Sequence, residues 1–395
     1  MGSRRFAFGA ALAVVGLAVL LALQPQIVVL AGEGFPDPEW PVPGAFVPIA
    51  GDDRPLGRET APIPDAALDR FAASGGKALV VVRDGRLVAE HYAEGYSSDT
   101  RLNSYSLVKT LVGALTVRAV ADGEFALDTP ISTLLPPAMN WVDASSTWSL
   151  ADVTVEDVLA MRGALVAAPE PAKAASGAGD KTLDDAAFSP FGTLAKLHAY
   201  GPDALVRRMR VRANGRGAFR YQSAYTALLG LMLERAYGRS LPDLLSELIW
   251  KPAGAARADW RRYPRDQRAT AYCCLYARPV DWARVGAFLL ANGTPDEPFL
   301  PRAPWSEFIL PDLGPARREG VYGWHIRHDV LDREGEPLSG PFAYAMGHDG
   351  QIMYLLPDHD AVVVRFGATP QLLHSTLYEL APLLLRGPVD RAARR

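Results

Sequence analysis

The sequence predicts an α+β fold: an antiparallel sheet flanked by helices and built from both ends of the chain, with a mostly helical subdomain inserted between them. Two β-rich runs flank Asp84-Gly85, a combination typical of a hairpin, and further strand-like runs follow residue 320. Helical patterns fill most of residues 123–250. Strands at both ends with helices between them favour one shared sheet, built from residues 65–105 and 255–386.

The elements of this domain, residues 65–386, are predicted in chain order. A helix at 65–73 precedes the hairpin strands 78–83 and 86–92, and a long helix follows at 106–121, before Asp122-Gly123. The remaining predicted helices are 153–161, 183–200, 223–237, 279–291 and 370–385, and the remaining strands are 322–328, 342–347, 351–356 and 361–367.

The segments outside this domain have distinct compositions. Residues 1–31 begin with two arginines near the terminus and continue with the uncharged run FAFGAALAVVGLAVLLAL, which is typical of an export signal and long enough for a bilayer. We therefore expect a signal peptide or a retained membrane anchor, with the folded domain exported. Residues 32–64 are rich in proline and glycine and predict a linker, and residues 387–395 form a basic tail.

Charge excludes one class of partner. The formal net charge is −3 and the pI about 6.2, so the chain has no basic excess with which to neutralise phosphates. We therefore expect no nucleic-acid partner.

One lysine lies in an unusual position. Lys109 falls inside a helical run that is apolar on nearly every face, which indicates a buried helix. Ser106 precedes it by three residues, so the two side chains share one face of the first turn. Burying an unpaired ammonium is costly and favours the neutral amine, which beside a serine is a general base beside a nucleophile. A second Ser-x-x-Lys match, Ser74 to Lys77, lies in a glycine turn before a strand, and we interpret it as loop.

Three motifs in order carry a family resemblance. They are Ser106-Leu107-Val108-Lys109, Tyr221-Gln222-Ser223 and His348-Asp349-Gly350, framed by VTVEDVLAMRG at 153–163 and DWARVGAFLLANG at 281–293. With these motifs the sequence resembles the penicillin-recognising serine hydrolases over residues 65–385. It is most similar to the branch related to class C β-lactamases, which includes esterases and 6-aminohexanoate-oligomer hydrolases. The resemblance implies a β-lactamase/transpeptidase-like fold.

The resemblance also implies roles for these residues. Ser106 would carry the acyl group, Lys109 would accept its proton as general base, and Tyr221 would relay a proton to the leaving group. The backbone N–H groups of Ser106 and Gln351 would form the oxyanion hole. His348, Asp349, Gly350 and Ser223 would contact a small-molecule ester or amide, and no metal or cofactor is implied.

Two departures from the β-lactamase pattern bear on the substrate. Ser223 stands where β-lactamases usually have asparagine, and His348 stands in place of their lysine. Both favour an ester or amide of another kind, as in the 6-aminohexanoate-dimer hydrolases. A β-lactamase or a D-alanyl-D-alanine carboxypeptidase on the same scaffold is the alternative.

Three rival interpretations stay open. A metal hydrolase would use the histidines and aspartates that gather late in the chain, although no His-Glu-x-x-His spacing is present and His325 and His328 on one strand would face opposite ways. A membrane-anchored, non-catalytic binding domain could use the same scaffold. A cysteine nucleophile is the third. For Cys273 and Cys274 we expect two small buried side chains, since neighbouring cysteines rarely bridge.

Overall fold

The computed structural model describes residues 16, 21–22, 24–33, 45–135, 152–167, 192–206, 209–211, 217–310, 321–368 and 374–385. Most of the apolar N-terminal run, the basic tail and part of the predicted helix 183–200 lie outside them. Within the described residues, no helix has both the length and the apolar character needed to cross a membrane. The predicted signal peptide or anchor therefore stays a prediction.

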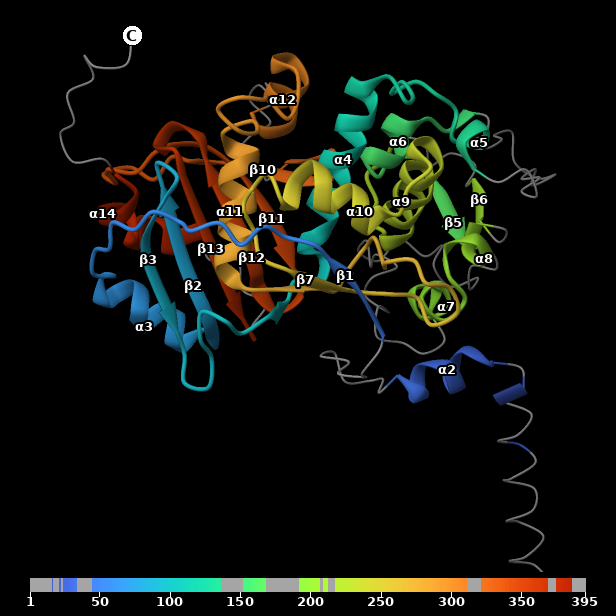
Figure 1. Ribbon diagram of the computed structural model, residues 1–395, viewed down its shortest axis with the longest axis horizontal. Coiled ribbons are helices and arrows are strands. Elements are labelled where there is room, and N and C mark those ends of the chain that lie inside the picture. The colour runs from blue at the N-terminus through green and yellow to red at the C-terminus, as the bar shows by residue number, and fades with distance from the viewer. Residues whose placement is uncertain are drawn as a thin grey trace, which may run out of the picture.

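A seven-stranded antiparallel sheet forms one half of the molecule, beside a helical block (Figure 1). Its order is β3-β2-β13-β12-β11-β10-β9, so the hairpin from the start of the domain pairs directly with the last strand, β13. The strands are β2 Gly76–Arg83, β3 Arg86–Tyr92, β9 Val321–Gly323, β10 Ile326–Leu331, β11 Gly340–Gly347, β12 Gln351–Leu356 and β13 Ala361–Gly367. The prediction of one antiparallel sheet built from both ends is confirmed.

The two faces of this sheet bury different sets of side chains. Along β2, Ala78, Val80 and Val82 belong to a core shared with the helical block, whereas Leu79 and Val81 belong to a second core. Helix α11 (Pro279–Leu290) packs on the first face, and α3 (Asp65–Ala73), α13 (His374–Glu379) and α14 (Ala381–Leu384) contribute to the second. Strand alternation thus places the sheet between two helical layers.

The helical block lies between the two contributions to the sheet, as predicted. Its main helices are α4 (Lys109–Asp122) and α9 (Ser223–Tyr237), which pack against each other, together with α6 (Val155–Leu159), α7 (Thr193–Tyr200) and α10 (Leu241–Leu245). Short helices α5 (Ile131–Leu134) and α8 (Pro202–Val206) and the π-helical turn Ser246–Trp250 complete its described part.

Two small sheets were not predicted. One has the order β1-β7-β8-β4, formed by Phe46–Ile49, Ala258–Arg261, Leu275–Ala277 and Leu102–Asn103; the other pairs β5 (Leu165–Ala167) with β6 (Met209–Val211). Each strand has two to four residues, which is too short for alternation to be recognised in the sequence. Strand β4 leads directly into the Ser106 segment, and β8 pairs beside it.

Part of the expected linker belongs to the fold. Strand β1 lies within residues 32–64 and pairs with β7, and its last residue, Ile49, is fully buried. Helix α2 (Gln26–Gly32) also packs against α7. The Glu33 carboxylate is hydrogen-bonded to His198 Nε2 and forms an ion pair with Arg261, each at 2.7 Å. Described segments from residues 24–33 and 45–64 thus pack on the domain that we expect to begin at residue 65.

Two predicted elements are each divided in the structure. The strand expected at 322–328 is split into β9 and β10 by a turn at Trp324 and His325, both with positive φ. The final helix is split into α13 and α14 because Pro382 stands in the first turn of α14, where it cannot donate a bond to the preceding turn. His325 is therefore a turn residue. The prediction that His325 and His328 face opposite ways along one strand is wrong, because only His328 lies on a strand.

Candidate active site

Ser106 and Lys109 meet at the start of the buried helix. Ser106 lies in a 3₁₀ turn, Tyr105–Val108, that runs straight into α4, which begins at Lys109. Lys109 Nζ lies 2.8 Å from Ser106 Oγ in a hydrogen bond, and Lys109 is only 2% exposed. The i, i+3 spacing thus gives the predicted contact between nucleophile and base.

Lys109 has a second polar partner and an aromatic neighbour. Its Nζ donates a hydrogen bond to the backbone carbonyl of Tyr272 at 2.7 Å. The Tyr221 ring, from the segment just before α9, has its centroid 5.2 Å from Nζ. Tyr221 therefore lies beside the Ser106–Lys109 pair, as predicted, although it is 112 or more residues away along the chain.

A backbone segment after β7 holds the nucleophile turn. The N–H of Cys274 donates to the Tyr105 carbonyl at 3.2 Å. Leu275 accepts from the N–H of Ser104 at 3.0 Å and donates its own N–H to Ser104 Oγ at 3.1 Å. Together with the bond from Lys109 to Tyr272, residues 272–275 make four hydrogen bonds to residues 104–109. We call residues 272–275 the clamp segment.

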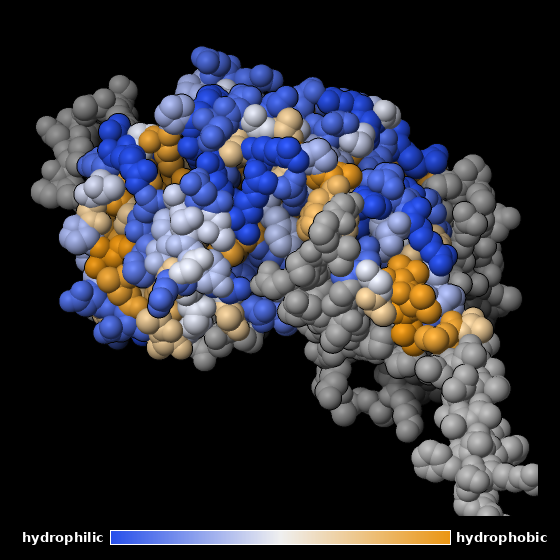
Figure 2. Space-filling model, turned by 60° about the horizontal axis from the view of Figure 1, so that its bottom comes forward, coloured by the Kyte–Doolittle hydropathy of each residue, from blue (hydrophilic) through white to orange (hydrophobic). Residues whose placement is uncertain are grey.

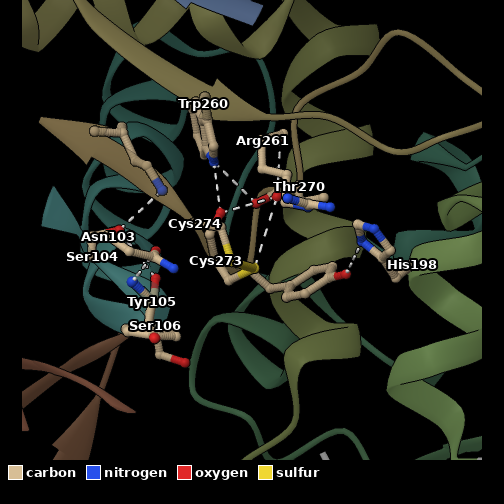
Figure 3. The surroundings of a disulfide bond; sticks show 12 residues. Asn103, Ser104, Tyr105, Ser106, His198, Trp260, Arg261, Thr270, Cys273 and Cys274 are labelled. Atoms are coloured by element: carbon tan, nitrogen blue, oxygen red, sulfur yellow. Dashed lines mark hydrogen bonds between the residues drawn. A yellow bond between two sulfur atoms is a disulfide. The ribbon is translucent and has the colours of Figure 1, made fainter. Parts of the chain in front are cut away.

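The clamp segment contains a disulfide between adjacent residues, Cys273 and Cys274. Our expectation of two unbridged side chains is wrong. The bridge is compatible with this backbone because Cys274 takes a positive φ of 70° in a turn that other groups secure. The Cys273 carbonyl accepts hydrogen bonds from Trp260 Nε1 at 2.9 Å and from Thr270 Oγ1 at 3.0 Å. Figure 3 shows the disulfide between Thr270 and the Asn103–Ser106 segment.

The His348-Asp349-Gly350 motif forms the tight turn between β11 and β12. The His348 ring lies edge-on to the Tyr105 ring at 5.6 Å, and its Nε2 pairs with Asp349 Oδ1 at 3.1 Å. Asp349 and Gly350 both have positive φ, 58° and 75°. The motif thus lies against the nucleophile turn, and Asp349 is one side-chain partner of His348.

Gly347, which sequence reasoning missed, makes a close approach from β11 to the start of the nucleophile turn. A Cβ on Gly347 would lie 2.3 Å from the Ser104 carbonyl oxygen and 3.3 Å from the Leu107 nitrogen. Only glycine fits such an approach without displacing the backbone. The signal was present as the glycine immediately before the His-Asp-Gly motif.

The turn is braced from β13. Arg365 donates to the Gly350 carbonyl at 2.8 Å. The Gln351 side chain exchanges two hydrogen bonds of 2.9 Å with the backbone of Gly367. The backbone N–H of Gln351, our predicted oxyanion donor, is directed at the His348 carbonyl within the turn. It thus has an acceptor of its own in this structure.

A buried histidine supports the other side of α4. His325 lies between Thr226 Oγ1, 2.9 Å from its Nε2, and the Leu159 carbonyl, 2.7 Å from its Nδ1. Burial lowers the pKa of His325 to about 3, so the ring is neutral at ordinary pH. Gly113 of α4 packs on this turn, since a Cβ there would lie 2.5 Å from the Trp324 carbonyl oxygen. His325 is therefore a structural residue.

Ser223 is the remaining predicted site residue, and a metal centre is the remaining alternative for which the structure gives an observation. Ser223 is the first residue of α9, two residues after Tyr221, and is buried. In the described part of the chain, no group of three or more histidine, cysteine, aspartate or glutamate side chains is arranged to hold a metal ion.

The profile of the beta-lactamase family matches residues 65–376. The chain belongs to the beta-lactamase family. It is 25% identical over 308 residues to the 6-aminohexanoate-dimer hydrolase of Paenarthrobacter ureafaciens, covering 74% of this chain and 72% of that protein.

Solved structures show the same fold at low identity. A proposed 6-aminohexanoate-dimer hydrolase from Bacillus anthracis superposes with a TM-score of 0.62 at 17% identity, over 86% of this chain and 89% of that one. A D-stereospecific amidohydrolase from Streptomyces sp. gives 0.55 at 16% identity, over 80% and 96%. The β-lactamase/transpeptidase-like fold and the serine hydrolase class predicted from the motifs are therefore confirmed.

Proposed function

We propose that this serine hydrolase cleaves an ester or amide through an acyl-enzyme on Ser106. The observation that carries the proposal is the 2.8 Å hydrogen bond between Nζ of the buried Lys109 and Ser106 Oγ. A neutral amine at Nζ can donate to the Tyr272 carbonyl and at the same time accept the Ser106 hydroxyl proton. The Ser106 oxygen attacks the substrate carbonyl, and the proton passes by way of Lys109 and the Tyr221 phenol to the leaving group. Water then hydrolyses the acyl-enzyme.

The oxyanion formed in this step needs two donors. One is the Ser106 N–H at the start of the helical segment, where the helix dipole adds stabilisation. The second is the N–H of Gln351, the donor that the family resemblance implies. In this structure that N–H is directed at the His348 carbonyl, so it would exchange this acceptor for the oxyanion when substrate binds.

An ester or amide that is not a β-lactam fits the site better than a β-lactam. Ser223 lacks the carboxamide that β-lactamases offer at this position, and His348 is paired with Asp349. The similarity to a 6-aminohexanoate-dimer hydrolase favours a linear amide as substrate. A β-lactam ring or a D-alanyl-D-alanine peptide is the second candidate, because the scaffold is shared.

A fluorophosphonate probe tests the nucleophile. We expect the wild type to be labelled on Ser106, Ser106→Ala to lose labelling, and Ser74→Ala, at the other Ser-x-x-Lys match, to keep it. Equal labelling of wild type and Ser106→Ala would refute the assignment. Turnover of p-nitrophenyl esters and a linear aminohexanoate dimer, with little turnover of nitrocefin, would then support the proposed substrate class over the β-lactam alternative.

A further inference from the structure

Arg365 is a charged residue buried within the sheet layer. It belongs to β13, whose other residues are apolar or glycine. Hydrophilic residues gather mainly at the outer surface, as the face drawn in Figure 2 shows, whereas Arg365 is only 6% exposed. Strand alternation places its side chain, like that of Val363, on the second face of the sheet, away from the helical block. A cation thus lies in an otherwise apolar layer.

The protein partners of the Arg365 guanidinium are neutral oxygens. Its Nη1 donates to the carbonyls of Asp349 at 3.4 Å and Gly350 at 2.8 Å. Its Nη2 donates to the carbonyl and the hydroxyl oxygen of Ser74, at 2.6 and 2.9 Å. Within the described parts of the chain, no carboxylate pairs with Arg365, and its buried Nε–H has no acceptor. The positive charge is therefore not compensated by an acid of the described chain, and burial lowers the pKa of this arginine.

A small cavity lies on this side of the sheet, where β2, β12 and β13 face α3 and α13. It leaves about 20 Å³ open to the centres of water-sized spheres, and one water molecule needs roughly 10–15 Å³ on this measure. Arg365 and Thr376 both line it, and the Thr376 hydroxyl, like the Arg365 Nε, is buried without a hydrogen-bond partner among the described residues. The apolar part of the lining comes from Phe71, Leu79, Ile352, Val363 and Leu377. Two unused polar groups thus border a space of about the size of one small ligand.

The charge and the unused donors favour an anion over water in this cavity. A water molecule can accept from the Arg365 Nε–H, but it leaves the buried positive charge uncompensated, which is costly in apolar surroundings. A halide accepts from the Nε–H and from the Thr376 hydroxyl together, and it supplies the opposite charge. The other phenol in the lining, Tyr354, is already hydrogen-bonded to His374 at 3.0 Å. The cavity volume suits a single small anion and excludes one as large as an acyl substrate.

We propose that this cavity binds a monovalent anion of the size of chloride, held between Arg365 Nε and Thr376 Oγ1. The site lies behind the sheet and does not depend on the reaction proposed at Ser106. It is joined to that region by structure, because the same guanidinium holds the Gly350 carbonyl, one residue before Gln351. The bound anion therefore stabilises the domain and secures the turn between β11 and β12 from behind.

Bromide tests the site directly, because it can replace chloride and gives an anomalous X-ray signal. Crystals grown in sodium gluconate and soaked in sodium bromide should show an anomalous peak within hydrogen-bond distance of Arg365 Nε and Thr376 Oγ1. In solution, sodium chloride should raise the Tm by about 2–4 °C over sodium gluconate at equal ionic strength, the shift expected for a ligand at roughly ten times its Kd. Bromide should give a shift of similar size.

Two threonine variants separate the cavity from a general effect of salt. Thr376→Val removes the hydroxyl with little change in shape, so the chloride-dependent Tm shift should fall by half or more and the bromide peak should weaken. Thr116→Val is the matched control, since it removes a buried hydroxyl that donates to the Val112 carbonyl within α4. It should keep the full shift. A water molecule in place of the bromide peak, or equal Tm shifts in wild type and Thr376→Val, would overturn the anion site.

Discussion

Two Ser-x-x-Lys segments occur in this chain, and only one of them brings its serine and lysine together. In the first, Ser74 follows the last residue of α3, and its hydroxyl donates to the Phe71 carbonyl at 3.1 Å and accepts from Arg365 at 2.9 Å. Gly75 then takes a φ of 61°, and Lys77 continues into β2 with its Nζ 5.7 Å from the Tyr96 ring. Our interpretation of this match as loop is confirmed only for the turn at Gly75, since Ser74 caps the end of α3 and Gly76 and Lys77 begin β2.

The second segment differs in backbone rather than in spacing. From Ser106 to Asp122 the chain runs from a 3₁₀ turn into α4, so Ser106 and Lys109 share a face. The clamp segment fixes that turn from one side, and His325 supports α4 from the other, where Thr110 Oγ1 donates to the His325 carbonyl at 2.7 Å. The comparison shows that the motif predicts chemistry only where a buried helix and its surroundings convert the spacing into a contact.

The largest expected difference in kcat between the two segments comes from replacing the lysine of each by methionine. Lys109→Met removes the proposed general base, which typically contributes about 10²–10⁴-fold to the rate. We expect kcat on p-nitrophenyl butyrate to fall by that factor. Lys77→Met, the matched change in the other segment, should leave kcat within about two-fold. The assignment is wrong if both variants keep wild-type kcat, as measured at matched active-site concentrations.

The sequence predicted the sheet and the catalytic juxtaposition because both follow from local patterns. The hairpin around Asp84-Gly85, the helix beginning near Ser106 and the three ordered motifs each carry their signal in adjacent residues. These elements are then related by the topology of the domain, because strands at both of its ends can form one sheet in only a few arrangements.

What the sequence did not predict depends on backbone groups and close approaches. The Tyr272 carbonyl that binds Lys109 is common to every residue type, so no side-chain pattern marks it. We did not predict the disulfide because it depends on the backbone turn at Cys273 and Cys274. That turn is held by hydrogen bonds from residues distant in the sequence, such as the one from Trp260 to the Cys273 carbonyl. The direction of the Gln351 N–H likewise depends on the turn between β11 and β12.

Opening the disulfide has the next largest expected effect. A dithiol such as dithiothreitol would reduce Cys273–Cys274 to two thiols and itself become a cyclic disulfide. Residues 272 and 274 would then be free to shift where they hold Lys109 and Tyr105. Because small misplacements of catalytic groups can cost about 10²-fold, we expect kcat to fall about 10- to 100-fold with little change in KM.

The matched control is a Cys273→Ser, Cys274→Ser double variant, which should show the lower kcat from the start and no response to the dithiol. Mass spectrometry after alkylation counts the thiols. If the dithiothreitol-treated wild type contains two alkylated cysteines and its kcat is unchanged, the position of the clamp segment does not depend on its disulfide.

The two serines should differ in stability as well as in chemistry, and this is the smallest of the expected effects. Ser74 is buried, and its hydroxyl makes two hydrogen bonds within the fold, one of them to the charged Arg365. Ser74→Ala should therefore lower the free energy of unfolding by about 1–2 kcal/mol, measured by urea denaturation. Ser106 is half-buried in a site arranged for reaction, so Ser106→Ala should change stability by about 0.5 kcal/mol or less. An equal loss of unfolding free energy in the two variants would mean that Ser106, like Ser74, contributes to the stability of the fold. The two segments would then differ in chemistry but not in stability.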